Sequence, residues 1–216
     1  MLKRVNELFT RYRKLVMFFF FLVIFFLVLN DVFDKEIISY DVWAHDVLVK
    51  NLRSDFLTMV MTIITDFGSA LALVVLSLSF FLFSKNKKKG ICVSLNLIII
   101  TVINLILKFM IQRPRPSGFN IINESGYSFP SGHSMVSTAF YGLIIYLVYK
   151  NVKNKWLKIT LMISLFLLII MICISRIYLG VHYASDVIGG FCISVSYLMI
   201  FIMIVPRFLD IIDKDF

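Results

Sequence analysis

The sequence predicts an all-α membrane protein with six transmembrane helices, and three observations lead to that prediction. Hydrophobic residues make up 60% of the 216 residues and charged residues only 16%, which is more apolar surface than a soluble fold of this size could bury. Six apolar runs are each close to the length of about 20 residues that a helix needs to cross about 30 Å of hydrocarbon. Basic residues collect in the short segments between these runs. The six predicted spans are residues 16–33, 57–83, 91–111, 134–149, 157–175 and 187–206.

The first run follows a basic start and looks superficially like a signal peptide. No small-residue cleavage site comes after it, so we expect a retained helix. The three cysteines, Cys92, Cys173 and Cys192, all lie inside apolar runs, which favours packing roles over a disulfide framework or a zinc site. No internal repeat or low-complexity linker is visible, so we expect one membrane-embedded domain over residues 1–216.

The distribution of basic residues predicts the orientation. If the N-terminus is cytoplasmic, the inner segments 1–15, 84–90, 150–156 and the C-terminal tail, with the flanking Lys158, hold 15 of the 22 Lys and Arg residues. This bias is typical of cytoplasmic loops. The net charge of +9 therefore reflects membrane topology, and we expect no nucleic-acid partner. Both termini are predicted to be cytoplasmic.

The run at 57–83 is too long for one perpendicular span, because 27 helical residues reach about 40 Å. Asp66 interrupts it, so the alternatives are one tilted helix, or an outer interfacial segment at 57–65 followed by a span from Phe67. Asp66 is favoured as a cap or interfacial residue over a neighbour of the active site. Segment 34–56, which carries Tyr40 and Trp43, is predicted to be an outer interfacial amphipathic stretch.

A first polar cluster, at 108–116, lies at the outer end of the third span. Lys108 falls within apolar sequence, and Pro114 and Pro116 disfavour further helix. A lysine there is costly unless it meets an anion or a water-filled cavity. The plainer interpretation is a snorkelling lysine beside two helix-ending arginines, Arg113 and Arg115.

A second cluster, Pro130, Ser131, Gly132 and His133, directly precedes the fourth run. Such a helix start presents unpaired N–H groups and the positive end of the helix dipole, where phosphate binds well. An ordinary helix cap with an interfacial histidine is the simpler alternative.

The third cluster, at 175–186, holds Arg176, His182 and Asp186. His182 and Asp186 are four residues apart, so on a helix they would share one face and the carboxylate could reach an imidazole nitrogen. Such a contact fixes the tautomer and leaves the other nitrogen free to attack. All three clusters fall on the outer side of the predicted topology, which makes coincidence improbable.

In order and spacing these clusters resemble the signature of the type 2 phosphatidic acid phosphatase (PAP2) superfamily. That signature reads Lys, six residues, Arg-Pro; then Pro-Ser-Gly-His; then Ser-Arg, five residues, His, three residues, Asp. The chain is similar to small bacterial members related to phosphatidylglycerophosphatase B and undecaprenyl diphosphate phosphatases. The resemblance implies a helical bundle that hydrolyses a lipid phosphate monoester or diphosphate at the extracytoplasmic face of the cell membrane.

The resemblance also implies how the site residues share the work. Cations and N–H donors would hold the phosphoryl oxygens, His182 oriented by Asp186 would form a phosphohistidine, and His133 would protonate the leaving oxygen and then activate water. No suitable set of ligands for a catalytic metal accompanies the motifs, so we expect no cofactor and metal-independent turnover. We assign no role to Arg113 and Tyr183, which lie near the motifs but are not part of them. The predicted phosphate-binding residues are Lys108, Arg115, Ser131, Gly132 and Arg176.

The motif residues contact only phosphate, so they do not identify the lipid. Undecaprenyl diphosphate, converted to undecaprenyl phosphate, ranks first, with phosphatidylglycerophosphate close behind and phosphatidic acid also possible. Two other classes of protein fit parts of the pattern. A vanadium-dependent haloperoxidase has a similar anion site, and an anion transporter would explain Lys108 but not the spacing of His182 and Asp186. The sequence carries no sign of oligomeric state.

Overall fold

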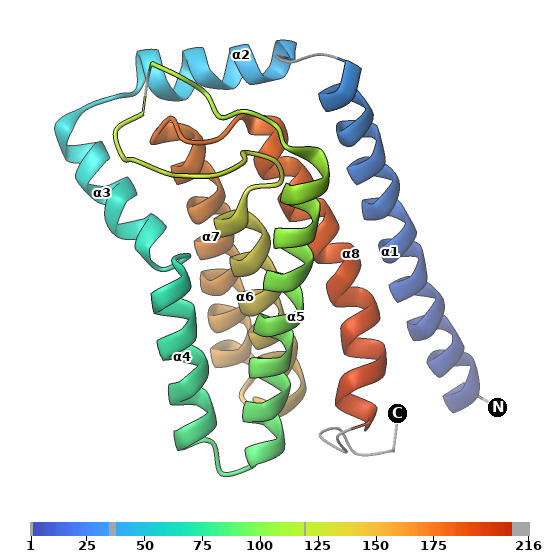
Figure 1. Ribbon diagram of the computed structural model, residues 1–216. Helices are drawn as coiled ribbons and strands as arrows, with labels where there is room; N and C mark the ends of the chain where they lie inside the picture. Colours follow the sequence, from blue (N-terminus) through green and yellow to red (C-terminus); the bar gives the residue numbers. More distant parts are fainter. Residues whose placement is uncertain (1, 35–37, 119, 209–216) are drawn as a thin grey trace.

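The computed structural model describes residues 2–34, 38–118 and 120–208, and within these ranges it is helical with no strand. The helices form a bundle with long, roughly aligned members (Figure 1). Helix α6 lies at its centre and contacts α5, α7 and α8, while α1 packs on α8, α3 on α7 and α4 on α5. The helices are α1 Leu2–Asp34, α2 Ser39–His45, α3 Asp55–Asp66, α4 Ala70–Phe83, α5 Lys87–Ile111, α6 Gly132–Asn151, α7 Lys155–Tyr178 and α8 Ala184–Phe208.

Within the described ranges, four helices are long and apolar enough to cross a membrane, and the bent pair α3 and α4 raises the number to five. The fourth predicted span, at 134–149, corresponds to α6, which is not among them. Its central position explains this, because it buries Ser134, Ser137 and Thr138 against neighbouring helices instead of facing lipid. Six spans therefore stay a prediction. The four spans are Tyr12–Asp34, Lys87–Ile111, Lys155–Tyr178 and Ala184–Val205.

The long run at 57–83 is not one tilted helix. It breaks after Asp66 into α3 and α4, which meet at 46°. The break is stabilised locally, because Ser69 caps α4 by accepting the N–H of Ala72 at 3.2 Å and Tyr141 donates to the carbonyl of Phe67 at 2.7 Å. Gly68 lets the break approach α7, since a Cβ there would lie 2.7 Å from a methyl group of Ile172. Asp66 is exposed as the last residue of α3.

Helix α2 and its π-helical continuation Asp46–Asn51 lie across one end of the bundle (Figure 1). Asp41 and Ala44 face inward, whereas Val42 and Trp43 are exposed, so this part of segment 34–56 has the two faces that were predicted. The turn between α4 and α5, with Lys85 to Lys89, and the α6–α7 connection lie at the opposite end. The basic α4–α5 turn and α2 thus lie at opposite ends of the bundle, as the predicted topology requires. The orientation in the membrane stays a prediction. Residues 35–37 and the tail from 209 lie outside the described residues.

The contact between α4 and α5 generates a prediction about stability. A Cβ at Gly90 would lie 2.6 Å from the backbone Cα of Phe81, and backbone cannot move aside as a side chain can. Overpacking of this kind costs about 1–3 kcal/mol. We therefore expect Gly90→Ala to lower the thermal unfolding temperature of the detergent-solubilised protein.

Gly142→Ala is the matched control, because its Cβ would meet only the end of the Leu198 side chain, at 2.6 Å, which can rotate. If Gly90→Ala unfolds at the same temperature as Gly142→Ala or higher, the close packing of α4 on α5 is wrong.

Candidate active site

The end of α5 delivers three basic residues to one end of the bundle. Helix α5 stops at Ile111, where Gln112 adopts a left-handed conformation with φ 51°, and Pro114 and Pro116 follow. The Lys108 side chain, one turn before the end, donates to the carbonyl of Tyr127. Arg113 and Arg115 lie beyond the helix and point in different directions, as their partners show.

The start of α6 positions the second cluster. Ser131 caps this helix, because its hydroxyl oxygen accepts the Ser134 N–H at 3.5 Å and the Ser134 hydroxyl at 3.0 Å. Ser131 is fully buried and is not among the residues that line the cavity described below, and its hydroxyl is engaged in the helix cap. Gly132 and His133 do line the cavity. A Cβ at Gly132 would lie 3.9 Å from the Cε of Lys108.

His182 and Asp186 are close, but not for the reason that the spacing indicated. His182 is not helical: α7 ends at Tyr178, Gly180 turns the chain with φ 74°, and α8 begins only at Ala184. Asp186 lies in the first turn of α8 and accepts the N–H of Tyr183 at 2.8 Å. The turn brings the His182 Nδ1 to 3.4 Å from the Asp186 Oδ2.

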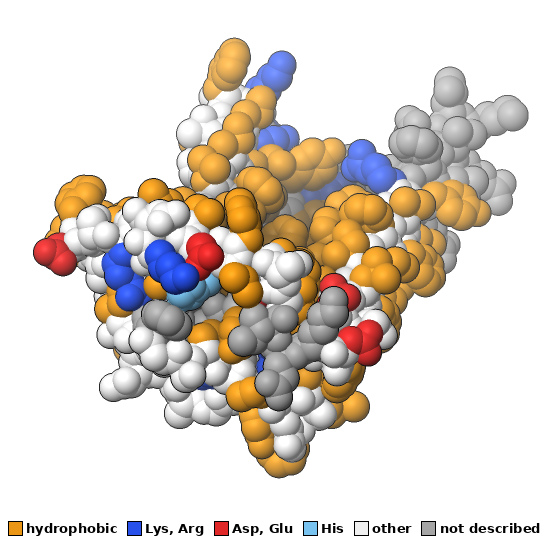
Figure 2. Space-filling view, turned by 90° about the horizontal axis from the view of Figure 1, so that it is seen from above, with side chains coloured by type: hydrophobic (Ala, Val, Ile, Leu, Met, Phe, Trp, Pro, Cys, Tyr) orange, Lys and Arg blue, Asp and Glu red, His pale blue; other side chains and the backbone are white. Residues whose placement is uncertain are grey.

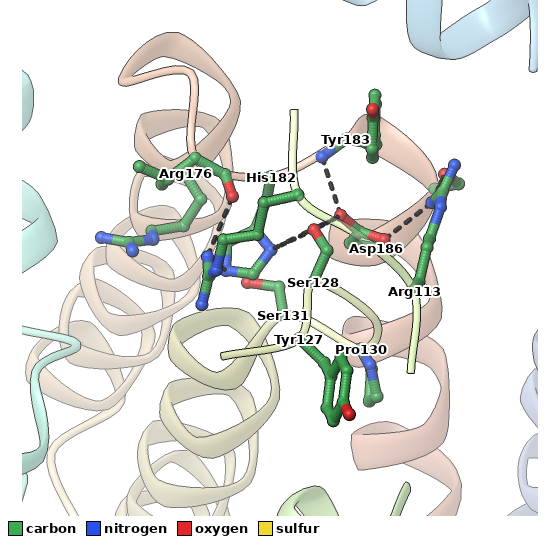
Figure 3. Close-up of polar contacts among 12 residues, drawn as sticks. Arg113, Tyr127, Ser128, Pro130, Ser131, Arg176, His182, Tyr183 and Asp186 are labelled. Atoms are coloured by element: carbon green, nitrogen blue, oxygen red, sulfur yellow. Dashed lines mark hydrogen bonds and ion pairs between the residues drawn. The ribbon is translucent and has the colours of Figure 1, made fainter. Parts of the chain in front are cut away.

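The contacts of His182 define its tautomer (Figure 3). An Arg115 nitrogen lies 3.2 Å from the His182 Nε2, and because a guanidinium can only donate, Nε2 must accept. The ring proton therefore lies on Nδ1, which faces the Asp186 carboxylate and, at 3.3 Å, the Ser128 hydroxyl. Ser128 in turn donates to Asp186 at 2.5 Å. The Nε2 lone pair is thus directed at a cation and away from the carboxylate.

Two arginines meet a carboxylate that the motif analysis did not single out. Arg176, which is 1% exposed, donates to Glu124 Oε1 and, at 2.8 Å, to the Thr65 hydroxyl. Arg115 lies 3.7 Å from the other Glu124 oxygen and donates to three loop carbonyls, those of Ser125, Gly126 and Val181. Glu124 is the only acidic residue between Asp66 and Asp186 in the sequence. A lone carboxylate between two clusters of basic residues was the feature of the sequence that could have indicated this contact.

These groups surround a cavity of about 360 Å³. Figure 2, which looks down on this end of the molecule, shows basic side chains, an acidic one and a histidine gathered on a surface that is otherwise largely apolar or uncharged. Lys108 and Arg115 line the opening and Arg176 lies buried behind Glu124, with which it pairs, so three cations and one carboxylate give the site a surplus of positive charge. The lining includes Lys108, Arg115, Glu124, Gly132, His133 and His182.

Burial and neighbouring charges set the protonation states of His182 and Glu124, which both lie in loops. Burial lowers the pKa of His182 to about 4, although the neighbouring Asp186 opposes this, so the imidazole is neutral at pH 7 and able to act as a nucleophile or base. Burial alone would raise the pKa of Glu124, but the Arg176 guanidinium holds it below its usual value. Glu124 is therefore an anion in the unliganded site.

Arg113, to which the sequence analysis gave no role, is buried away from the cavity. It donates to Asp186 Oδ1 at 2.7 Å and to Asp41 Oδ2 at 2.9 Å, and its guanidinium lies 4.3 Å from the centre of the Tyr183 ring. Asp41 comes from α2, 72 residues earlier in the chain, so no motif spacing could reveal this contact. Within the described residues, no three His, Cys, Asp or Glu side chains are grouped to hold a metal ion.

Comparisons with known proteins agree with this geometry. The sequence model of the PAP2 superfamily matches residues 89–210. The chain is 34% identical over 157 residues to phosphatidylglycerophosphatase B of Bacillus subtilis (strain 168), covering 70% of this chain and 76% of that protein. It is 26% identical over 151 residues to undecaprenyl-diphosphatase of Sulfolobus acidocaldarius, covering 65% and 68%.

A solved structure extends the likeness to the whole fold. The crystal structure of a transmembrane PAP2 type phosphatidylglycerolphosphate phosphatase from Bacillus subtilis superposes with a TM-score of 0.76 at 30% identity. The match covers 94% of this chain and 98% of that one. This chain therefore belongs to the PAP2 superfamily and is a multi-pass membrane phosphatase that acts on lipid phosphates.

Proposed function

We propose that the enzyme removes phosphate from phosphatidylglycerophosphate through a covalent intermediate on His182. The observation that carries the proposal is the contact between the His182 Nε2 and Arg115, 3.2 Å apart. In the unliganded site Arg115 occupies the direction of the Nε2 lone pair, so a phosphoryl group that took Arg115 as its partner would lie next to this nitrogen. Attack then requires phosphorus at about 3–3.5 Å from Nε2.

In the first step the His182 Nε2 attacks phosphorus, and the bond from phosphorus to the lipid oxygen breaks. Lys108, Arg115 and Arg176 stabilise the negative charge on the phosphoryl oxygens. The Nδ1 proton stays on the ring, so the phosphorylated imidazole is positively charged and Asp186 stabilises it. His133, which also lines the cavity, must carry a proton in the complex with the phosphate dianion and gives it to the leaving oxygen.

In the second step His133 takes a proton from water, and the resulting hydroxide attacks the phosphohistidine. The nitrogen to phosphorus bond breaks, inorganic phosphate leaves and His182 returns to its neutral form. Gly132 contributes its backbone N–H at the helix start. Ser131 supports this cradle indirectly, since its hydroxyl caps α6.

The order of candidate substrates changes from the one that the sequence suggested. We place phosphatidylglycerophosphate first because the relative named for that activity is 34% identical and matches across the fold. The relative named undecaprenyl-diphosphatase is 26% identical, so undecaprenyl diphosphate becomes the second candidate. The residues that line the cavity come from the end of α5, the start of α6 and the loops beside them, at the end of the bundle opposite the basic α4–α5 turn. We therefore propose that hydrolysis occurs at the extracytoplasmic face of the cell membrane.

A substrate panel tests this function. Purified enzyme in detergent, with a chelator present, is expected to release phosphate from phosphatidylglycerophosphate faster than from undecaprenyl diphosphate or phosphatidic acid. His182→Ala is expected to lose at least about 1,000-fold in turnover, because loss of a nucleophile removes the covalent route.

Thermal unfolding of His182→Ala at the wild-type temperature is the control for folding. Turnover of this variant near the wild-type rate would refute the nucleophile, whereas activity that requires an added metal ion would refute metal-independent hydrolysis. Faster release from undecaprenyl diphosphate would restore that lipid to first place.

Glu124 generates a separate prediction. Its carboxylate engages Arg176 and Arg115, two of the proposed phosphate-binding groups, so an arriving phosphate must compete with it. We expect Glu124→Gln to lower the concentration of inorganic phosphate that gives half-maximal inhibition by several-fold. The measurement is phosphate inhibition of lipid hydrolysis at fixed substrate concentration.

Asp55→Asn, which alters an exposed carboxylate at the start of α3, serves as the control and is expected to match wild type. Weaker inhibition of Glu124→Gln by phosphate would contradict competition and mean that Glu124 holds the arginines in place for the substrate.

A further inference from the structure

A closed set of buried polar contacts joins three distant segments behind the catalytic pair. The Arg113 guanidinium lies between two carboxylates, with one nitrogen 2.7 Å from Asp186 and the other 2.9 Å from Asp41. The side chains of both aspartates are fully buried, and that of Arg113 is 4% exposed. The same Arg113 nitrogen that contacts Asp186 donates to the Ser185 hydroxyl at 2.6 Å.

Asp41 uses both of its carboxylate oxygens. Its Oδ1 accepts the backbone N–H of Ser185 at 2.7 Å, and its Oδ2 accepts the Ser185 hydroxyl at 2.7 Å as well as Arg113. Asp41 thereby caps the first turn of α8 from a different helix, α2, and satisfies an N–H that α8 itself leaves without a partner. The carboxylate thus contacts two features at once, the helix start and the guanidinium.

The arrangement fixes how Asp186 presents itself to His182. One oxygen of Asp186 is occupied by Arg113, which leaves Oδ2 to contact Ser128, the Tyr183 N–H and the imidazole. Figure 3 shows Arg113 and His182 on opposite sides of the Asp186 carboxylate. Two carboxylates and one guanidinium sum to one negative charge, which is the complement of the positive charge that forms on a phosphorylated His182.

We propose that Asp41 and Arg113 are positioning residues for the hydrolysis reaction, with Arg113 orienting Asp186 and Asp41 orienting and partly neutralising Arg113. The inference rests on the proposed role of His182 as the nucleophile. If Asp41 were uncharged, the whole charge of Arg113 would fall on Asp186 and weaken its attraction to the imidazolium. The surface helix α2 is then part of the catalytic apparatus and more than a cover over the bundle end.

Asp41→Asn separates this role from the helix cap, because the asparagine carbonyl oxygen can still accept the Ser185 N–H while its amide group cannot accept from Arg113. We expect kcat to fall roughly tenfold, at the low end of what loss of an outer hydrogen-bond partner costs at the histidines of metal sites. KM should change little, because Asp41 does not line the cavity.

The decisive comparison repeats the substitution in an Asp186→Asn background. If Asp41 acts only through Arg113 and Asp186, then Asp41→Asn lowers kcat no further once Asp186 is neutral. A purely structural role of Asp41 would lower kcat by the same factor in both backgrounds, and that result would overturn the proposal. So would an unchanged kcat in the single variant.

Two further variants keep the experiment decisive. Asp46→Asn removes a partly exposed carboxylate on the same segment, one that pairs with Lys50 at 2.6 Å, and is expected to leave kcat unchanged. If Asp41→Asn does not fold, Arg113→Lys replaces it in both backgrounds, because lysine keeps the charge but cannot span both carboxylates. We again expect kcat to fall when Asp186 is present and to fall no further in the Asp186→Asn background. Wild-type turnover of Asp186→Asn would overturn the proposal together with the role of Asp186, whereas His182→Ala tests the proposed function independently.

Discussion

The ion pair between Arg113 and Asp186 is the contact on which the site depends, because it joins the end of α5 to the start of α8 where water is excluded. Its atoms lie 2.7 Å apart and both side chains are almost wholly buried. Removing one member of such a pair leaves an uncompensated buried charge, which costs about 3–5 kcal/mol. Asp41 adds α2 to the same pair. The positions of the two chain segments that carry the proposed phosphate-binding cations and the proposed catalytic pair are therefore coupled, so a shift of one segment displaces the other.

On the cavity side of the same carboxylate the charge balance is reversed. Lys108 and Arg115 border the cavity and Arg176 lies behind it, while Glu124 is the one carboxylate in the lining among the described residues and pairs with both arginines. The unliganded site keeps a cationic excess that a phosphate dianion would neutralise. Asp186 lies between the two regions: its contact with Arg113 fixes its orientation, and its contact with His182 directs the Nε2 lone pair outward into the cationic region. The apolar bundle excludes water from the buried contact between Arg113 and Asp186, which strengthens that interaction.

Much of this could be predicted from the sequence, since local rules govern local features. The proline residues ended α5 at the predicted residue, Ser131 capped α6, and the spacing of the third cluster brought His182 to Asp186. The long second run did break beside Asp66. The spacing predicted the right pair of residues but the wrong local structure, because a glycine turn and not a shared helix face creates the contact. Five apolar spans follow from composition, but the central α6 does not satisfy the same test because its neighbours are protein.

Contacts between remote segments were beyond such rules. Asp41 and Arg113 are 72 residues apart, and no periodicity links them.

The most direct test of the covalent mechanism is a rapid-quench experiment with a lipid carrying a radiolabelled phosphate, followed by mapping of the labelled peptide. We expect a transient phosphoryl group on the peptide that contains His182, and none in His182→Ala. Phosphate release without any labelled protein at any quench time, or a label on His133 instead, would contradict it.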